Sequence, residues 1–119
     1  MDIDPGTYHL RIRQGKTLRK TFTFRTGSPL FAVDLTGWSA RAQVRSNVES
    51  EVVLIDFTDS DGSIELGGPA GSITLVLTDA VTAALDPVFG VWELELVEPG
   101  GDVFSLLEGP VTVESEVTR

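Results

Sequence analysis

Apolar and polar residues alternate with a period of two along most of the chain. The pattern is clearest where large apolar residues alternate with glutamates, in Trp92, Glu93, Leu94, Glu95 and Leu96. This period is typical of a β-strand with one buried face and one face in solvent. The stretch therefore predicts a half-buried strand, and the turn residues 98–102 after it predict an antiparallel return.

The same alternation recurs in short segments separated by glycine, proline, serine and aspartate. The segments expected as strands are residues 8–13, 18–24, 38–45, 52–57, 64–66, 73–77, 91–97, 103–108 and 111–113. We expect the segment 52–57 to be an inner strand, and Gly109-Pro110 to turn the chain before the last segment. About eight short strands with turns between them indicate a β-sandwich or barrel.

One segment changes the period. After Thr78 and Asp79, which are good helix caps, Val81, Ala84 and Leu85 recur at i, i+3 and i+4. This predicts one or two helical turns that cover an open end of the sandwich.

The buried faces of the alternating segments predict the core. Its expected members include Leu10, Phe22, Phe24, Trp38, Ala42, Leu75, Trp92 and Leu94. Lys20 falls on the apolar side of its segment, which predicts a sheet edge, a bulge or a lysine that extends its amine to solvent.

The length and composition fit one small domain. We expect residues 1–6 to form an N-terminal arm and residues 7–119 to form a single β-sandwich domain. The absence of cysteine excludes disulfides and thiolate metal sites. The chain begins without the apolar run of a signal peptide, and no apolar run is long enough to span a bilayer, so no membrane partner is expected.

Charge is distributed unevenly. The net charge is −9, but residues 1–45 hold eight basic and three acidic residues, whereas residues 46–119 hold one basic and fifteen acidic residues. Such asymmetry either marks a partner surface or reflects two faces that pair within the molecule. The overall acidity argues against direct nucleic-acid binding, which depends on neutralising phosphates.

Several charged residues alternate onto the solvent side of the expected strands and form a possible protein interface. They are Arg11, Arg13, Arg19, Arg25, Arg41, Arg45, Glu93 and Glu95. If the basic strands share a sheet, they form a positive face that cannot neutralise itself. Such a face would meet an acidic neighbour, for instance the next subunit of a ring.

The candidates for chemistry are weak. His9 is the only histidine and lies on a solvent-facing position, so no catalytic site and no histidine-rich zinc site are expected. Residues 59–62 fail the spacing of a calcium loop and predict a hairpin turn. The glycines in residues 67–71 precede a strand instead of a helix, so they predict a turn and not a phosphate site. No cofactor is expected.

Several segments occur in an order that resembles a known family of proteins. The matching pieces are residues 14–18 with 22–24, 34–41 with 43–45, 70–75, 83–85, 91–96 and 107–113. In this order they resemble the small β-sandwich structural proteins of tailed bacteriophages and prophages. The chain is similar over nearly its whole length to the N-terminal immunoglobulin-like domain of phage baseplate upper proteins.

The resemblance implies an all-β, immunoglobulin-like antiparallel sandwich of about eight strands with one short helix. It implies a non-enzymatic virion protein, made in the bacterial host cytoplasm, that docks on a ring of the particle as a tail or baseplate adaptor or a fibre anchor. Its partners would be other virion proteins, and multiple copies of the chain would form a symmetric assembly.

Two alternatives remain open. One is a capsid decoration or head-surface protein of the same fold. The other is a carbohydrate- or calcium-binding module, since a fold does not fix a function. Exposed aromatic residues would favour a carbohydrate binder, and the pattern predicts none because Trp38 and Trp92 both fall on apolar sides of their strands.

Overall fold

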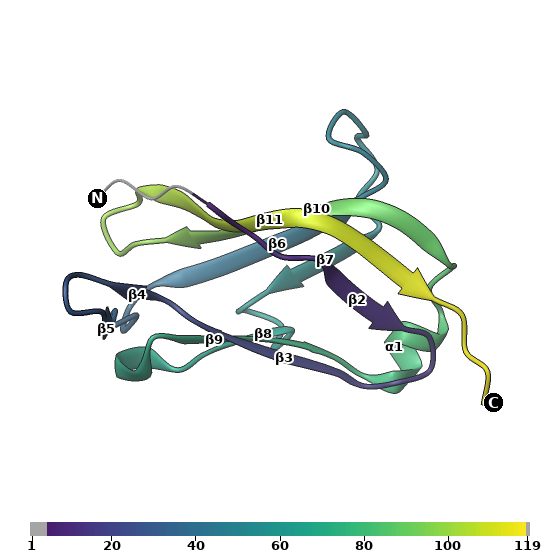
Figure 1. Ribbon diagram of the computed structural model, residues 1–119, viewed down its shortest axis with the longest axis horizontal. Helices are drawn as coiled ribbons and strands as arrows, with labels where there is room; N and C mark the ends of the chain where they lie inside the picture. Colours follow the sequence, from purple (N-terminus) through teal and green to yellow (C-terminus); the bar gives the residue numbers. More distant parts are fainter. Residues whose placement is uncertain (1–4, 119) are drawn as a thin grey trace.

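Two β-sheets packed face to face form the fold in the computed structural model, which describes residues 5–118 (Figure 1). The large sheet has the strand order β1-β11-β10-β6-β7, and β2 also pairs with β11. Its strands are β1 (Gly6–Thr7), β2 (Leu10–Arg13), β6 (Ser39–Arg45), β7 (Ile55–Thr58), β10 (Val88–Val97) and β11 (Val103–Glu114).

The second sheet is smaller and has the strand order β3-β9-β8. Its strands are β3 (Leu18–Thr23), β8 (Ile64–Leu66) and β9 (Ser72–Leu77). The remaining elements are a two-stranded ribbon of β4 (Arg25–Thr26) and β5 (Phe31–Ala32), a 3-10 turn η1 (Gly68–Ala70) and the helix α1 (Asp79–Ala83). Within residues 5–118, no helix has the length and apolar character needed to cross a membrane.

The connections make this an immunoglobulin-like sandwich, as predicted. The chain crosses between the sheets after β2, β5, β7 and β9, so both sheets are built from distant parts of the sequence. All pairs are antiparallel except that β1 and β2 run parallel to β11. Eight strands have three or more residues, and α1 is the short helix that the sequence predicts.

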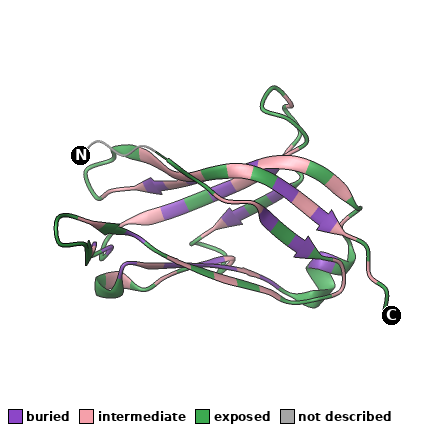
Figure 2. Cartoon of the chain, viewed as in Figure 1, coloured by how far each residue is buried: buried purple, intermediate pink, exposed green. Residues whose placement is uncertain are grey.

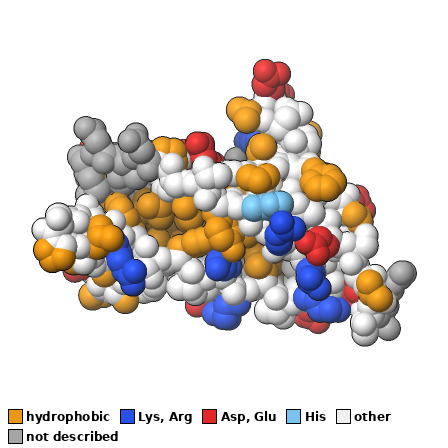
Figure 3. Space-filling model, viewed as in Figure 1, with side chains coloured by type: hydrophobic (Ala, Val, Ile, Leu, Met, Phe, Trp, Pro, Cys, Tyr) orange, Lys and Arg blue, Asp and Glu red, His pale blue; other side chains and the backbone are white. Residues whose placement is uncertain are grey.

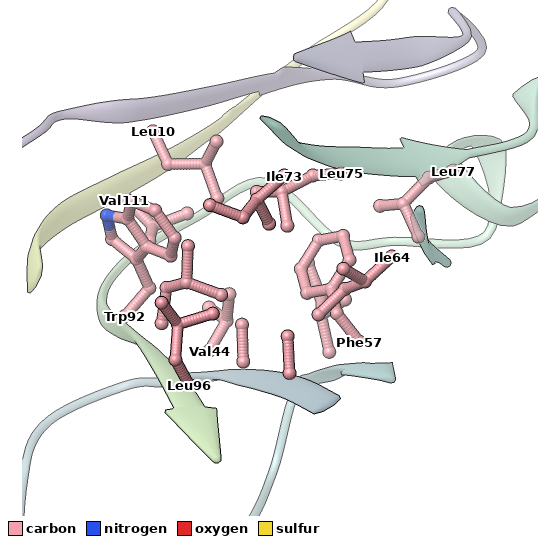
Figure 4. Packing of buried hydrophobic residues seen from close by; sticks show 14 of the residues in the cluster. Leu10, Val44, Phe57, Ile64, Ile73, Leu75, Leu77, Trp92, Leu96 and Val111 are labelled. Carbon is pink, nitrogen blue, oxygen red and sulfur yellow. The ribbon is translucent and has the colours of Figure 1, made fainter. Parts of the chain in front are cut away.

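The core lies between the sheets, and alternate residues are buried along β2, β6, β7 and the second half of β10 (Figures 2 and 4). Six of the eight predicted core residues are buried, namely Leu10, Phe24, Ala42, Leu75, Trp92 and Leu94. Phe22 and Trp38 are half-buried and pack against this cluster. The period of two therefore identified the buried face of each of these strands.

An aromatic cluster joins the two sheets. Trp92 on β10 stacks on Phe22 of β3 with ring centroids 6.0 Å apart, and Tyr8 packs edge-on against Phe22 at 5.0 Å. The Trp92 indole Nε1 donates a 2.8 Å hydrogen bond to the Tyr8 carbonyl oxygen. Trp92 thus links β10 to β3 and to the connection between β1 and β2, which are far apart in the sequence.

Lys20 lies on β3, an edge strand of the small sheet, as one of the three predictions for it stated. Its Nζ lies 5.1 Å from the Tyr8 ring centroid and 5.6 Å from that of Phe22. An inward-pointing charge on an edge strand disfavours the addition of another strand. This edge is therefore protected against unspecific pairing.

The prediction of a turn at Gly109-Pro110 is wrong, because β11 runs without a break from Val103 to Glu114. The interruption lies in the neighbouring edge instead, between β1 and β2. Pro110 has no N–H to donate to a neighbouring strand, and it lies where the edge formed by β1 and β2 is interrupted. Gly109, with a φ of +154°, lets the Tyr8 backbone pack directly against β11.

The prediction of an inner strand at residues 52–57 is also wrong. Its strand, β7, begins only at Ile55 and pairs with β6 alone, so it is the edge strand of the large sheet and not an inner one. Val52 is 65% exposed and belongs to the loop before β7. The predicted arm, residues 1–6, lies mostly outside the described residues, although Gly6 pairs with Leu107 in β1.

Helix α1 starts as predicted, with the Thr78 side chain accepting a hydrogen bond from the Val81 N–H. Its buried residue, however, is Thr82 and not Val81, which is 46% exposed. The Thr82 hydroxyl donates to the Lys16 carbonyl oxygen at 2.7 Å. The helix is therefore held by a hydrogen bond to the β2–β3 turn.

Replacing Thr82 with valine is expected to destabilise the fold by about 1–3 kcal/mol, because the Lys16 carbonyl oxygen loses the donor that the buried Thr82 hydroxyl provides. Urea unfolding measures this change. Thr78→Val on the same helix serves as the comparison, since it removes only an exposed cap, at about 1 kcal/mol. Equal stability of the Thr82→Val variant and the wild type would contradict the tethering role of this hydroxyl.

Candidate binding surface

The outward face of the large sheet carries a depression with a volume of 780 Å³. We call it the outer sheet face. It is formed by side chains of β6, β10 and β11 and by one residue of the β6–β7 loop: Arg41, Gln43, Arg45, Val48, Val91, Glu93, Glu95 and Glu108. These residues are brought together only by strand pairing, since β6 ends at Arg45 and β10 begins at Val88.

An acidic row crosses the middle of this face. Strand register places five residues side by side from β7 to β1: Asp56, Gln43, Glu93, Glu108 and Thr7. Within the described residues, none of the three carboxylates in this row forms an ion pair. Glu93 and Glu108 are directly opposite each other, an arrangement that destabilises a sheet.

The two arginines of the face are engaged within the molecule. Arg41 forms an ion pair with Glu95 on the adjacent strand, with an N–O distance of 2.7 Å. Arg45 donates to the Ser50 carbonyl oxygen at 2.6 Å and to Gln43 Oε1 at 2.8 Å. Arg45 therefore holds the β6–β7 loop but forms no ion pair within the described residues, and its single positive charge is outnumbered by the three carboxylates of the acidic row.

Apolar side chains border the acidic row on one side. Phe89 at the start of β10 is 81% exposed and Val48 in the loop is 84% exposed. Val91, between Phe89 and Glu93, is half-buried. The prediction that no aromatic residue is exposed is therefore wrong for Phe89, and also for Phe31 of β5, which is 60% exposed.

The remaining predicted interface residues do not join this face as one positive surface. Arg11 and Arg13 on β2 both pair with Glu114, and Arg19 on β3 pairs with Glu65. Arg25 lies on the separate β4–β5 ribbon. The basic strands are thus distributed over different sheets, and much of the basic charge pairs within the molecule. A single self-repelling positive face does not form.

In the predicted turn at residues 59–62, the Asp61 carboxylate is engaged in hydrogen bonds with Ser63. Asp61 accepts hydrogen bonds from the Ser63 hydroxyl and from the Ser63 N–H, the latter at 2.8 Å. These two bonds lower the pKa of Asp61. His9 also makes a local contact, with its Nε2 2.7 Å from the Thr112 hydroxyl. Among residues 5–118, no group of three or more His, Cys, Asp or Glu side chains is placed to hold a metal ion.

Two substitutions on the outer sheet face are expected to change the free energy of unfolding in opposite directions. Glu108→Gln is expected to raise the free energy of unfolding by about 0.2–1 kcal/mol, because it removes a like-charge neighbour of Glu93. Glu95→Gln is expected to lower it by a similar amount, because Arg41 loses its partner. Thermal unfolding at low and high salt measures both. A loss of stability in both variants would contradict the repulsion inferred for Glu93 and Glu108.

Comparison with known proteins leaves the family of this chain open. No protein-family model and no curated protein matches the sequence. Among solved structures, the chain is similar to one from a photo-crosslinking analysis of multimeric cell-adhesive interactions of VGSC beta subunits, with a TM-score of 0.48, 14% identity and 99% of each chain covered.

Two other similar structures are murine CRIg and extracellular domains 3–5 of Drosophila OTK. Murine CRIg has a TM-score of 0.36 and 10% identity, with 91% of this chain and 92% of that chain covered. The OTK structure has a TM-score of 0.35 and 12% identity, with 95% of this chain and 35% of that chain covered. No function follows from likenesses of this degree.

Proposed function

We propose that this chain is a non-enzymatic structural protein of a tailed-bacteriophage particle, which docks on a ring of the particle as a tail or baseplate adaptor or a fibre anchor. The resemblance of its ordered segments to phage structural proteins supports the virion assignment. The immunoglobulin-like sandwich agrees with the fold that this resemblance implies.

The observation that carries the docking role is the outer sheet face. A surface that only kept the protein soluble does not require two glutamates opposite each other, Glu93 and Glu108, on the same face as an exposed Phe89. Carboxylates that repel each other are tolerated where a partner supplies the missing opposite charge. Lys20 at the β3 edge further disfavours docking by strand addition at that edge.

The composition of purified particles tests the virion assignment. Particles from the phage or lysogen that encodes the chain are separated into heads and tails, and the chain is quantified against the major proteins of each fraction. A fixed ratio to the tail proteins is expected. Enrichment with heads would instead favour the capsid decoration alternative, and absence from both fractions would refute the virion role.

A further inference from the structure

The outer sheet face combines an unpaired acidic row with an apolar border. We propose that it binds a protein partner through a lysine or arginine side chain seated at Glu93 and Glu108, with apolar neighbours of that side chain packed on Phe89, Val48 and Val91. The inference rests on the proposed docking function, whose partner it describes by its chemistry.

The charge of the face selects the partner. Arg41 forms an ion pair with Glu95, and Arg45 donates hydrogen bonds to the loop and to Gln43, so neither guanidinium forms an ion pair with the acidic row. One oxygen of Glu93 accepts a 2.9 Å hydrogen bond from the Ser105 hydroxyl, and Glu108 is exposed. A cationic side chain between the two carboxylates would turn repulsion into two attractive contacts.

The apolar border limits the partner further. Phe89, Val91 and Glu93 are alternate residues of β10, so their side chains share one face at a spacing of about 7 Å. Alternate residues of an extended partner segment have the same spacing. A segment with one basic residue flanked at i−2 or i+2 by apolar residues therefore matches the face.

The β6–β7 loop supports the same surface. It projects beyond the sandwich, as Figure 1 shows, and Figure 3 shows apolar and acidic side chains gathered on it. Its backbone is ordered by hydrogen bonds, from Arg45 to the Ser50 carbonyl and from the Glu49 N–H to Asn47 Oδ1 at 3.0 Å. Val48 is therefore presented at the rim of the depression and contributes to its lining.

A peptide titration of the isolated, isotope-labelled protein by NMR tests the inference. The probe is the blocked pentapeptide acetyl-Val-Ala-Arg-Ala-Val-amide at millimolar concentration, with valine at i−2 and i+2 of the arginine, and the comparison peptide has glutamate in place of arginine. We expect saturable shifts of the Val91, Glu93 and Glu108 amides with the arginine peptide only. High salt should weaken them, because the contact is exposed to screening by ions.

The double variant Glu93→Gln/Glu108→Gln should weaken the peptide about fivefold or more. The matched control Glu65→Gln/Asp79→Asn, which removes two carboxylates from other parts of the molecule, should leave binding unchanged. Equal shifts with both peptides, no saturable shifts at this face, or unchanged binding to the double variant would overturn the inference. The titration needs no phage particle, so its result is separable from the virion assignment.

Discussion

Replacing Trp92 with alanine is expected to lower the free energy of unfolding by about 3–5 kcal/mol. The Trp92 side chain is only 3% exposed, stacks on Phe22 of the opposite sheet and donates a hydrogen bond to the Tyr8 carbonyl. Its truncation opens a large cavity between the sheets and releases the edge formed by β1 and β2. Urea unfolding followed by far-UV circular dichroism measures the loss.

Trp92→Phe separates the two contributions. This variant keeps an aromatic ring but loses the indole N–H, so we expect a loss of about 1–2 kcal/mol. A cost below about 1 kcal/mol for the alanine variant would show that Trp92 is not part of the core. Equal costs for both variants would show that the hydrogen bond to Tyr8, and not packing, provides its contribution.

Replacing Gly109 with alanine is expected to cost about 2–4 kcal/mol. Gly109 has a φ of +154°, and a Cβ at this position would overlap the Tyr8 carbonyl oxygen and lie 3.1 Å from the Tyr8 carbonyl carbon. Backbone atoms cannot rotate away as a flexible side chain can. The alanine variant must therefore shift the edge that carries Tyr8, and with it the acceptor of the Trp92 hydrogen bond.

Gly62→Ala is the matched control for this prediction. Gly62 also has a positive φ, of +87°, but a Cβ there would meet no atom within 4 Å. Its cost should be limited to backbone strain, at about 1–2 kcal/mol. If the two variants lose the same stability in urea, Gly109 is required for its backbone angle alone and the close approach of Tyr8 has no energetic consequence.

The sequence predicts the parts of this fold that depend on local pattern. Burial of Leu10, Ala42 and Leu94 follows from the period of two, because side chains of a strand point alternately to its two faces. A sheet edge was one of three positions predicted for Lys20, since a charge among apolar residues needs access to solvent. The start of α1 at Thr78 follows from its capping chemistry.

The errors arise where tertiary contacts override local pattern. Proline and glycine at 109–110 predict a turn, but a discontinuous neighbouring strand lets β11 continue through them. Val52 and Leu54 are apolar and predict a buried strand, yet the chain has no second sheet partner there to cover them. Hydrophobicity alone does not distinguish an inner strand from an exposed loop.

The binding surface was the least predictable feature. The acidic row depends on the pairing of Asp56, Glu93 and Glu108, which are distant in the sequence, and pairing register cannot be derived from a single strand. The exposure of Phe89 had a local signal, because it shares the phase of Glu93 on β10. The arginines predicted as interface residues proved to be engaged largely within the molecule.

Incorporation of variants into phage particles tests the central claim, docking through the outer sheet face, most directly. Particles are produced without the native chain and supplied with the wild type, Glu93→Gln/Glu108→Gln or the control Glu65→Gln/Asp79→Asn, each shown by circular dichroism to be folded. We predict that the wild type and the control are recovered in purified particles, whereas the Glu93/Glu108 variant is strongly depleted. Recovery of that variant at the wild-type level would contradict the claim.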